Sequence, residues 1–251
     1  MNRLQEYFEN EDHRIIDKWV HYFNVYDRYF SKYRGQNIII LEIGVSHGGS
    51  LQMWKDYFGK ESQIYGVDIN PFCKKFEERN VKIFIGSQSD RVFLQKLKNF
   101  IPKVDILIDD GGHMMDQQIV TFEELFDHVK EDGIYICEDL HTSYWSSHGG
   151  GFRRRGTFIE FSKNMIDYLH AWHSRQNNFK INQYSKSISG LHFYDSILVI
   201  EKGNISKPYS SRKGNPGFVE ETIDIYKISL RIKLQNYWDT FLARFRIAKR
   251  F

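Results

Sequence analysis

The chain has 251 residues, of which 41% are hydrophobic and 16% aromatic, which suits a large globular domain and excludes a disordered protein. The two cysteines are too few for a disulfide framework, and no apolar run approaches the roughly 20 residues that span a bilayer. The net charge is +3, but residues 226–251 hold seven basic residues and one acidic residue, so residues 1–225 carry −3 and do not form a surface that coats nucleic acid.

The predicted elements alternate between helices and strands along the chain. Aromatic residues recur at three- and four-residue spacing from Trp19 to Tyr33, which predicts a helix with one face on the core. Near-continuous apolar strands that alternate with helices are typical of an α/β protein with a doubly wound, mostly parallel sheet. The predicted strands are 38–43, 63–68, 81–85, 104–108 and 134–137. The predicted helices are 50–58, 71–79, 90–100, 114–130 and 157–173, followed by a closing antiparallel hairpin at 179–184 and 191–201.

The last part of the sequence has a different composition. Residues 203–217 are rich in Gly, Pro and Ser, which predicts a linker between a domain at 1–202 and an extension at 218–251. Residues 219–251 start acidic and end basic without Pro or Gly, which predicts a basic amphipathic helix. Such a helix packs on its own domain, packs on a second subunit, or makes a peripheral contact with the inner face of a membrane. Because the N-terminus is polar and acidic, we expect a cytoplasmic protein without a secretory signal.

The first predicted strand runs into a glycine-rich turn, ILEIGVSHGGS, in which Glu42 and Gly44 precede Gly48 and Gly49. A dinucleotide-binding turn has glycines at positions one, three and six, but the third position here is Ser46, so the turn is not built for a pyrophosphate. Asp68 ends the next predicted strand, where a carboxylate accepts hydrogen bonds from ribose hydroxyls. The pattern favours an adenosine cofactor without phosphates over an ordinary turn.

Two later predicted strands end in carboxylates. The sequence DILIDDGGH ends with Asp109, Asp110 and His113, and GIYICEDLH contains Glu138 and Asp139. The carboxyl ends of parallel strands share one edge, where these carboxylates would repel one another unless a cation lay between them. Oxygen ligands favour Mg²⁺ or another hard divalent cation, although each acid alone also suits a helix cap. Adjacent strand residues face opposite sides, so Glu138 and Asp139 can share an ion only if the strand ends before them.

The glycine-rich turn and the strand ends resemble the class I S-adenosylmethionine-dependent methyltransferases, which have a Rossmann-like fold. The resemblance implies that the turn holds the methionine part of the cofactor and that Asp68 holds the ribose. It also implies that Ser87 and Gln88 lie by the adenine and that Asp109 faces the methionine end. The implied cofactor-binding residues are Glu42, Gly44, Ser46, Gly48, Gly49, Asp68, Ser87, Gln88 and Asp109.

The acidic motifs resemble a narrower group, the metal-dependent sugar O-methyltransferases of antibiotic biosynthesis and the cephalosporin-hydroxylase-like proteins. Their pattern has D-D-G-S-H after the fourth strand and E-D after the fifth, whereas this chain has DDGGH, with Gly112 in place of Ser, and EDLHTSYW. The resemblance covers about residues 19–200. It implies that Asp110, Glu138 and Asp139 ligate the metal and that His113 is the general base.

We therefore expect a Mg²⁺-dependent O-methyltransferase that acts on a sugar hydroxyl of a glycan, polysaccharide or glycosylated metabolite. The basic segment SSHGGGFRRRG is either a solvated loop or a lid over a nucleotide-linked or lipid-linked acceptor. A catechol-type or other small-molecule O-methyltransferase is the alternative. DDGGH stands where methyltransferases of nucleic-acid amino groups carry residues like D-P-P-Y, and a non-catalytic cofactor-binding module would not need His113 beside the acids.

Overall fold

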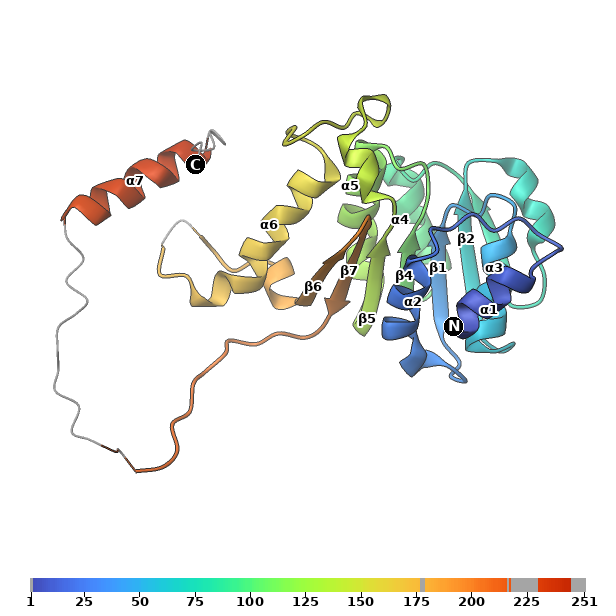
Figure 1. Cartoon of the computed structure of the whole chain (residues 1–251), viewed down its shortest axis with the longest axis horizontal. Coiled ribbons are helices and arrows are strands. Elements are labelled where there is room, and N and C mark those ends of the chain that lie inside the picture. Colours follow the sequence, from blue (N-terminus) through green and yellow to red (C-terminus); the bar gives the residue numbers. More distant parts are fainter. Residues whose placement is uncertain (1, 177–178, 216, 218–229, 245–251) are drawn as a thin grey trace. The chain divides into compact units, whose positions relative to one another are not determined.

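The computed structural model describes residues 2–176, 179–215, 217 and 230–244. The chain divides into two units, Met1–Pro208 and Tyr209–Phe251, which we treat separately. The first unit contains a seven-stranded sheet with the strand order β3-β2-β1-β4-β5-β7-β6 (Figure 1). Its strands are β1 (Ile39–Ile43), β2 (Gln63–Asp68), β3 (Val81–Ile85), β4 (Val104–Asp109), β5 (Val129–Cys137), β6 (Ile188–Tyr194) and β7 (Ile197–Lys202).

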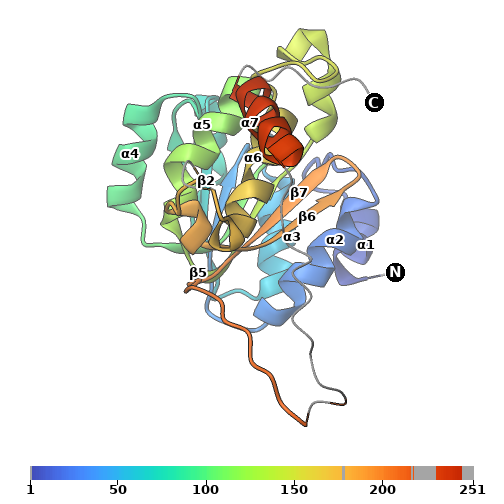
Figure 2. The ribbon, with the colours of Figure 1, turned by 90° about the vertical axis from the view of Figure 1, so that its left-hand side faces the viewer.

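Helices cover both faces of this sheet (Figure 2). The α-helices of the first unit are α1 (Arg3–Asn10), α2 (Tyr22–Phe30), α3 (Gly49–Phe58), α4 (Arg91–Phe100), α5 (Met115–Leu125) and α6 (Phe158–His170). Alternate side chains of the strands face two separate apolar clusters, because successive strand residues point to opposite sides. Ile40 packs with α1, α2 and α3 on one face, and Leu41 packs with α4, α5 and α6 on the other. The predicted doubly wound sheet is thereby confirmed.

Parallel pairing of five strands brings their carboxyl ends to one edge. β1 pairs in parallel with β2 and with β4, so that Ile43 lies opposite both Val67 and Asp109. β4 pairs in parallel with β5, with Asp109 opposite Cys137. The residues that follow β1, β2, β4 and β5 therefore meet at one edge, where ligands bind in sheets of this type.

The closing hairpin is antiparallel as predicted, but its predicted strands were wrong. Residues 179–184 form no strand, and the apolar run 191–201 is instead divided by a tight turn into β6 and β7. Ser196 adopts a positive φ of 61° in this turn. Because mainly apolar residues stand on both sides of Asp195 and Ser196, the prediction treated 191–201 as one strand and missed a turn that contains neither Gly nor Pro.

Three predicted helices also differ in the structure. The segment at 71–79 is a 3₁₀ helix at Pro71–Phe76, and the helix predicted at 114–130 ends at Leu125. After a 3₁₀ turn at Phe126–His128, Val129 already pairs with Val104 of β4. Trp19 lies before α2 rather than on it, and α1 was not predicted.

The second unit contains one described helix, α7 (Leu230–Arg244). Its Leu234, Tyr237 and Trp238 are exposed, and Trp238 stacks on Phe241 with ring centroids 5.6 Å apart. The rest of the predicted extension, 218–229 and 245–251, lies outside the described residues. Among the helices that the structure describes, none has both the length and the apolar character needed to cross a membrane.

Candidate active site

Two adjoining cavities open at the edge where the strands end. The larger, of about 710 Å³, lies between residues 15–20 and the loops that follow β1, β4 and β5. The smaller, of about 220 Å³, lies between the ends of β2 and β3 and the loop after β4. Gly44, Ser46, Asp110 and Gly111 line both cavities. A ligand that contacts these four residues can therefore extend from one cavity into the other.

The turn after β1 packs so closely on its neighbours that two positions exclude a side chain. A Cβ on Gly44, whose φ is 95°, would lie 2.0 Å from the carbonyl oxygen of Asp110. A Cβ on Gly49 would lie 2.5 Å from the carbonyl oxygen of Ile15. The glycines therefore let the turn approach both the loop after β4 and the N-terminal segment.

Asp68 holds this turn in place. One carboxylate oxygen of Asp68 accepts hydrogen bonds from the backbone N–H groups of Val45 and Ser46, both at 2.9 Å. The other oxygen accepts from the N–H of Asn70 at 2.8 Å. Asp68 also lines the smaller cavity, so one side chain both shapes the turn and faces the space beside it.

Glu42 is fully buried and lines neither cavity. Its carboxylate accepts hydrogen bonds from the Ser50 hydroxyl at 2.9 Å and from the Trp54 indole N–H at 3.1 Å. Burial raises the pKa of Glu42 to about 7. In this structure, Glu42 fixes α3 to the end of β1.

Gln88 organises the other side of the smaller cavity. Its amide nitrogen donates to Asp109 at 2.9 Å, and its amide oxygen accepts from the N–H of Gly112 at 2.8 Å. Ser87 and Gln88 line this cavity, whereas Asp109 is buried beneath it with Tyr135 as a second partner. Burial raises the pKa of Asp109 to about 7. The structure thus places Asp109 as a support for Gln88.

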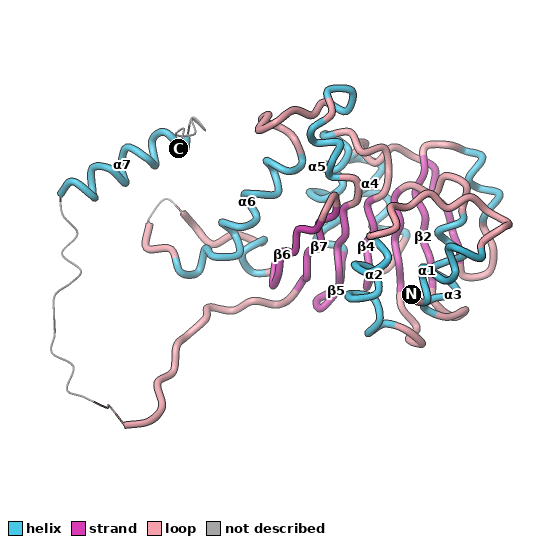
Figure 3. The backbone as a smooth tube through the Cα atoms, viewed as in Figure 1, coloured by secondary structure: helices cyan, strands magenta, loops and turns pink. Residues whose placement is uncertain are grey.

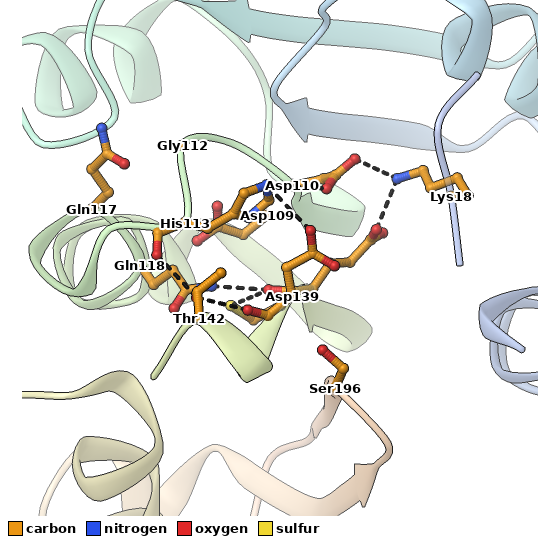
Figure 4. A network of polar contacts seen from close by, with 12 residues as sticks. Lys18, Asp109, Asp110, Gly112, His113, Gln117, Gln118, Asp139, Thr142 and Ser196 are labelled. Atoms are coloured by element: carbon orange, nitrogen blue, oxygen red, sulfur yellow. Dashed lines mark hydrogen bonds and ion pairs between the residues drawn. The ribbon is translucent and has the colours of Figure 1, made fainter. Parts of the chain in front are cut away.

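Asp110, His113 and Asp139 form the acidic cluster of the larger cavity (Figure 4). One potential ligand atom from each of the three lies within 4.8 Å of the others. The Nε2 atom of His113 is 3.4 Å from the carboxylate of Asp139 and 3.9 Å from that of Asp110. The Tyr22 hydroxyl donates to Asp139 at 2.9 Å and fixes that carboxylate from the other side.

His113 is held in an unusual backbone conformation. Its φ is 54°, and its carbonyl oxygen accepts a hydrogen bond from the Thr142 hydroxyl at 3.1 Å. Burial lowers the pKa of His113 below its ordinary value, so the ring is neutral near pH 7 and has a lone pair that can accept a proton. Its Nδ1 atom is buried without a hydrogen-bond partner among the described residues.

Glu138 and Asp139 face different partners because β5 ends at Cys137. Asp139 has a positive φ of 55°, which turns its side chain into the acidic cluster. Glu138 is fully buried, where its carboxylate accepts from the Tyr26 hydroxyl at 2.7 Å and from Lys18 at 2.8 Å. Burial and the charge of Asp110 raise the pKa of Glu138 to about 8.

Lys18 is a site residue that the sequence analysis missed. Its ammonium also donates to Asp110 at 2.5 Å, so that one cation bridges two of the predicted metal ligands. It belongs to residues 11–21, which run as a loop across the strand ends between α1 and α2 (Figure 3). No sequence pattern marks this lysine, and only the need to neutralise buried carboxylates could have predicted a cation there.

The basic loop at 146–156 makes local contacts. The Arg153 guanidinium lies over the Phe152 ring, 5.2 Å from its centroid, and Arg154 donates to the carbonyl oxygen of Gly150 at 3.3 Å. Neither arginine lines the two cavities described above. The hypothesis of a lid over an anionic acceptor therefore stays a prediction.

A third cavity, of about 430 Å³, lies beside the turn between β6 and β7. Its lining is mainly apolar and aromatic and includes Ile166 and Phe193. It adjoins the larger cavity through a shared wall, because His141 of its lining contacts Trp19 of the larger cavity, with ring centroids 5.6 Å apart. An apolar surface thus lies next to the acidic cluster.

Comparisons with known proteins agree with this architecture. The family model that matches the chain, at residues 41–140, describes a methyltransferase domain. Demethylmacrocin O-methyltransferase of Streptomyces fradiae is 34% identical over 224 residues, which are 84% of this chain and 55% of that protein. The 8-demethyl-8-alpha-L-rhamnosyl tetracenomycin-C 2'-O-methyltransferase of Streptomyces olivaceus is 34% identical over 197 residues, which are 74% of this chain and 52% of that protein.

A solved structure gives the same correspondence. The MycE methyltransferase from the mycinamycin biosynthetic pathway, in complex with Mg and SAH, matches with a TM-score of 0.72 and 34% sequence identity. The match covers 81% of this chain and 55% of that chain. The chain therefore spans about half the length of the curated relatives that it matches.

Proposed function

We propose that the chain methylates a sugar hydroxyl, because a methyltransferase-domain model matches residues 41–140 and two similar proteins are named O-methyltransferases, one of them of a rhamnosyl compound. The methyl donor would be S-adenosylmethionine and the acceptor a glycosylated small molecule. The observation that carries the proposal is the cluster of Asp110, His113 and Asp139 in the larger cavity, of which Asp110 also lines the smaller one. His113 would act there as the proton acceptor, next to the space proposed for an adenosine cofactor.

The cofactor would occupy both cavities, with its adenosine in the smaller one. Asp68, Ser87 and Gln88 line that cavity and can bind hydroxyl and amino groups. The turn at Gly44 and Ser46 lines both cavities and would contact the methionine part. When bound, S-adenosylmethionine supplies an electrophilic methyl group. Glu42 and Asp109 would act indirectly, by holding α3 and Gln88 in position.

The residues present fit a hard divalent cation. Asp110 and Asp139 belong to the acidic cluster, and the Lys18 ammonium joins Asp110 to the buried carboxylate of Glu138. Burial raises the pKa of both Asp110 and Glu138, and the nearby carboxylates of Asp139 and Asp110 raise these pKa values further, because like charges close together disfavour ionisation. We propose Asp110, Glu138 and Asp139 as metal ligands, with Mg²⁺ as the ion. When bound, such an ion supplies Lewis acidity that lowers the pKa of an acceptor hydroxyl.

His113 would be the general base. Its Nε2 atom faces the acidic cluster, and the neutral ring can accept the proton that the acceptor hydroxyl releases. Asp139 and Asp110 then stabilise the protonated ring, because opposite charges attract strongly in a partly buried site. The Thr142 hydroxyl orients His113 through its carbonyl oxygen.

The relatives favour a glycosylated metabolite as the acceptor, since one of them is named for a rhamnosyl compound. The apolar cavity beside His141 would suit the non-sugar part of such a molecule. A catechol-type acceptor is the second candidate, because its two vicinal hydroxyls could bind a metal ion in the same way as two neighbouring hydroxyls of a sugar. A nucleotide-linked or lipid-linked sugar is a further acceptor class. It would require the basic loop at 146–156 to contact the acceptor's phosphate groups.

A methyl-donor assay tests the proposed function. Glycosylated small molecules, nucleotide sugars and catechols would each be incubated with labelled S-adenosylmethionine, with Mg²⁺ and with excess chelator. We expect methyl transfer to the glycosylated compounds in Mg²⁺ alone. Full activity in the chelator would contradict the metal requirement, and activity on catechols alone would favour the second candidate.

Asp68→Asn should weaken the binding of S-adenosylhomocysteine by about 10-fold or more. The variant keeps the shape of the side chain but loses its charge, and a hydrogen bond to a charged group is worth about 1.5–3 kcal/mol. Isothermal titration calorimetry would measure the change. Asp90→Asn is the matched control, because Asp90 likewise accepts from backbone N–H groups but lines neither cavity. Equal affinity in both variants would contradict the ribose assignment.

The tail should bind anionic vesicles in a salt-sensitive way if it contacts a membrane. Each cation near an anionic surface contributes about 1 kcal/mol, and Arg231 and Lys233 accompany exposed Leu234 and Trp238 on α7. Vesicle sedimentation would compare the full chain with a chain that ends at Gly217. Loss of binding with activity retained supports the membrane contact. If the full chain does not bind the vesicles, the membrane contact is wrong. The remaining interpretations are that the tail packs on the domain or on a second subunit.

A further inference from the structure

Lys18 takes the position of a cation inside the acidic site. Its side chain is 2% exposed, and its ammonium lies 2.5 Å from Asp110 and 2.8 Å from Glu138. Figure 4 shows Lys18 directed toward Asp110. Burial opposes the charge, but the carboxylates of Asp110 and Glu138 raise the pKa of Lys18 above its ordinary value. The ammonium is therefore charged and satisfies two of the proposed metal ligands.

The residues beside Lys18 do not share its burial. Asp17, Trp19 and Val20 are exposed, so among residues 17–20 only the side chain of Lys18 is buried. The same stretch forms one wall of the larger cavity. It is anchored before Lys18, where the Ile15 carbonyl lies against Gly49, and after it, where His21 contacts the carbonyl oxygen of Asp195 at 3.0 Å. A movement of Lys18 would therefore shift this wall of the cavity, while the stretch stays anchored at Ile15 and His21.

The ammonium and a divalent ion compete for these carboxylates. Lys18 contacts the Oδ2 atom of Asp110 and the Oε2 atom of Glu138, and of the remaining two oxygens Oε1 of Glu138 already accepts from the Tyr26 hydroxyl. Like charges a few ångströms apart in a buried site repel strongly. A divalent ion that binds Glu138 through Oε2, and Asp110 beside it, therefore displaces the ammonium.

We propose that Lys18 is a tethered counter-cation, which balances Asp110 and Glu138 in the metal-free protein and is displaced into the cavity or solvent when a divalent metal binds. The inference rests on the metal site of the proposed function. Because Trp19 and Val20 follow Lys18 in the cavity wall, this displacement would also shift that wall. In the metal-free protein, the same lysine keeps two buried carboxylates from repelling each other.

Amine labelling of the full-length wild-type protein tests the displacement. The protein would be acetylated with an amine-reactive ester after chelator treatment and again in saturating Mn²⁺, with labelled lysines quantified by peptide mass spectrometry. We expect Lys18 to be protected without metal and labelled at least several-fold faster with it. Lys202 is the matched control, because it is also buried but donates to the carbonyl oxygens of Phe126, Asp127 and Val129, away from the acidic cluster. Its labelling should not change.

Electron paramagnetic resonance of Mn²⁺ would measure metal binding in parallel. Lys18→Met retains the apolar stem and removes the competing charge, so it should bind Mn²⁺ more tightly by at least roughly tenfold, the scale on which residues around a metal site change its affinity. Lys18→Arg retains the charge and should not show this gain. Weaker Mn²⁺ binding by Lys18→Met would show that Lys18 supports the metal site, contrary to the inference.

The outcomes separate this inference from the proposed function. If Mn²⁺ binds and Lys18 stays protected, the displacement is wrong while the metal site stands. If the wild-type protein binds no Mn²⁺, both the metal site and the competition are wrong. The labelling arm uses only the wild-type chain, so the inference stays testable even if Lys18→Met does not fold.

Discussion

Asp139→Asn is expected to lower methyl transfer by roughly 10²–10³-fold or more, the scale of one strong electrostatic contact to the reacting groups. The substitution removes a charge from the acidic cluster but retains an oxygen that can accept from Tyr22. Because the Asp139 side chain is 22% exposed, the core is unaffected and the fold should remain intact. Initial rates in saturating Mg²⁺ and a thermal unfolding curve would measure the two effects separately.

Asp127→Asn is the matched control for this prediction. Asp127 is a carboxylate of the same unit, 66% exposed and paired with Lys98, and it lines neither cavity of the site. Its substitution should leave the rate unchanged. If Asp139→Asn retained normal turnover and normal Mn²⁺ affinity, Asp139 would not be a metal ligand, and the acidic cluster would have to be assigned a structural role.

His113→Asn should lower turnover by roughly 10²–10⁴-fold, the usual contribution of a general base. Asparagine suits the substitution because it tolerates the positive φ of 54° better than most residues, so the loop keeps its conformation. The binding of S-adenosylhomocysteine should change little, because His113 does not line the smaller cavity. Single-turnover rates and calorimetry would measure the chemical step and cofactor affinity.

His47→Ala tests which of the two histidines that line the larger cavity, His47 or His113, is the general base. His47 also lines this cavity, but it is exposed and lies on the turn after β1. We expect it to retain most of the wild-type turnover. A large loss in His47→Ala together with near-normal turnover in His113→Asn would transfer the role of general base to His47.

The sheet could be predicted because its strands are short apolar runs whose ends carry polar signals. The bounds of β2 and β3 match the prediction, and the other parallel strands begin or end within a few residues of it. The hairpin was misplaced because the turn at Asp195 and Ser196 is marked only by these two residues, without Gly or Pro, inside an otherwise largely apolar run. The helix predicted to reach Lys130 was too long, because the apolar spacing continues through Phe126 and Val129 into β5.

The candidate site could be predicted only for residues that directly follow the ends of parallel strands. Parallel pairing brought Asp110 and Asp139 together, whereas Glu138, one residue after the end of β5, faces Lys18 and Tyr26. Which way each carboxylate faces depends on packing that no local pattern encodes. Glu42 and Asp109 therefore face buried partners instead of a cavity, and Lys18 arrives from a segment without regular structure.

The peptide of Asp110 and Gly111, which lines both cavities, has a thermodynamic consequence. A Cβ on Gly44 would meet the Asp110 carbonyl and a Cβ on Gly111 would meet the Gln88 amide, so this peptide cannot shift toward one cavity without disturbing the other. Any ligand that repositions it on one side changes the binding free energy on the other, and such coupling is reciprocal. Divalent metal should alter the dissociation constant of S-adenosylhomocysteine by the same factor by which that ligand alters the affinity for metal.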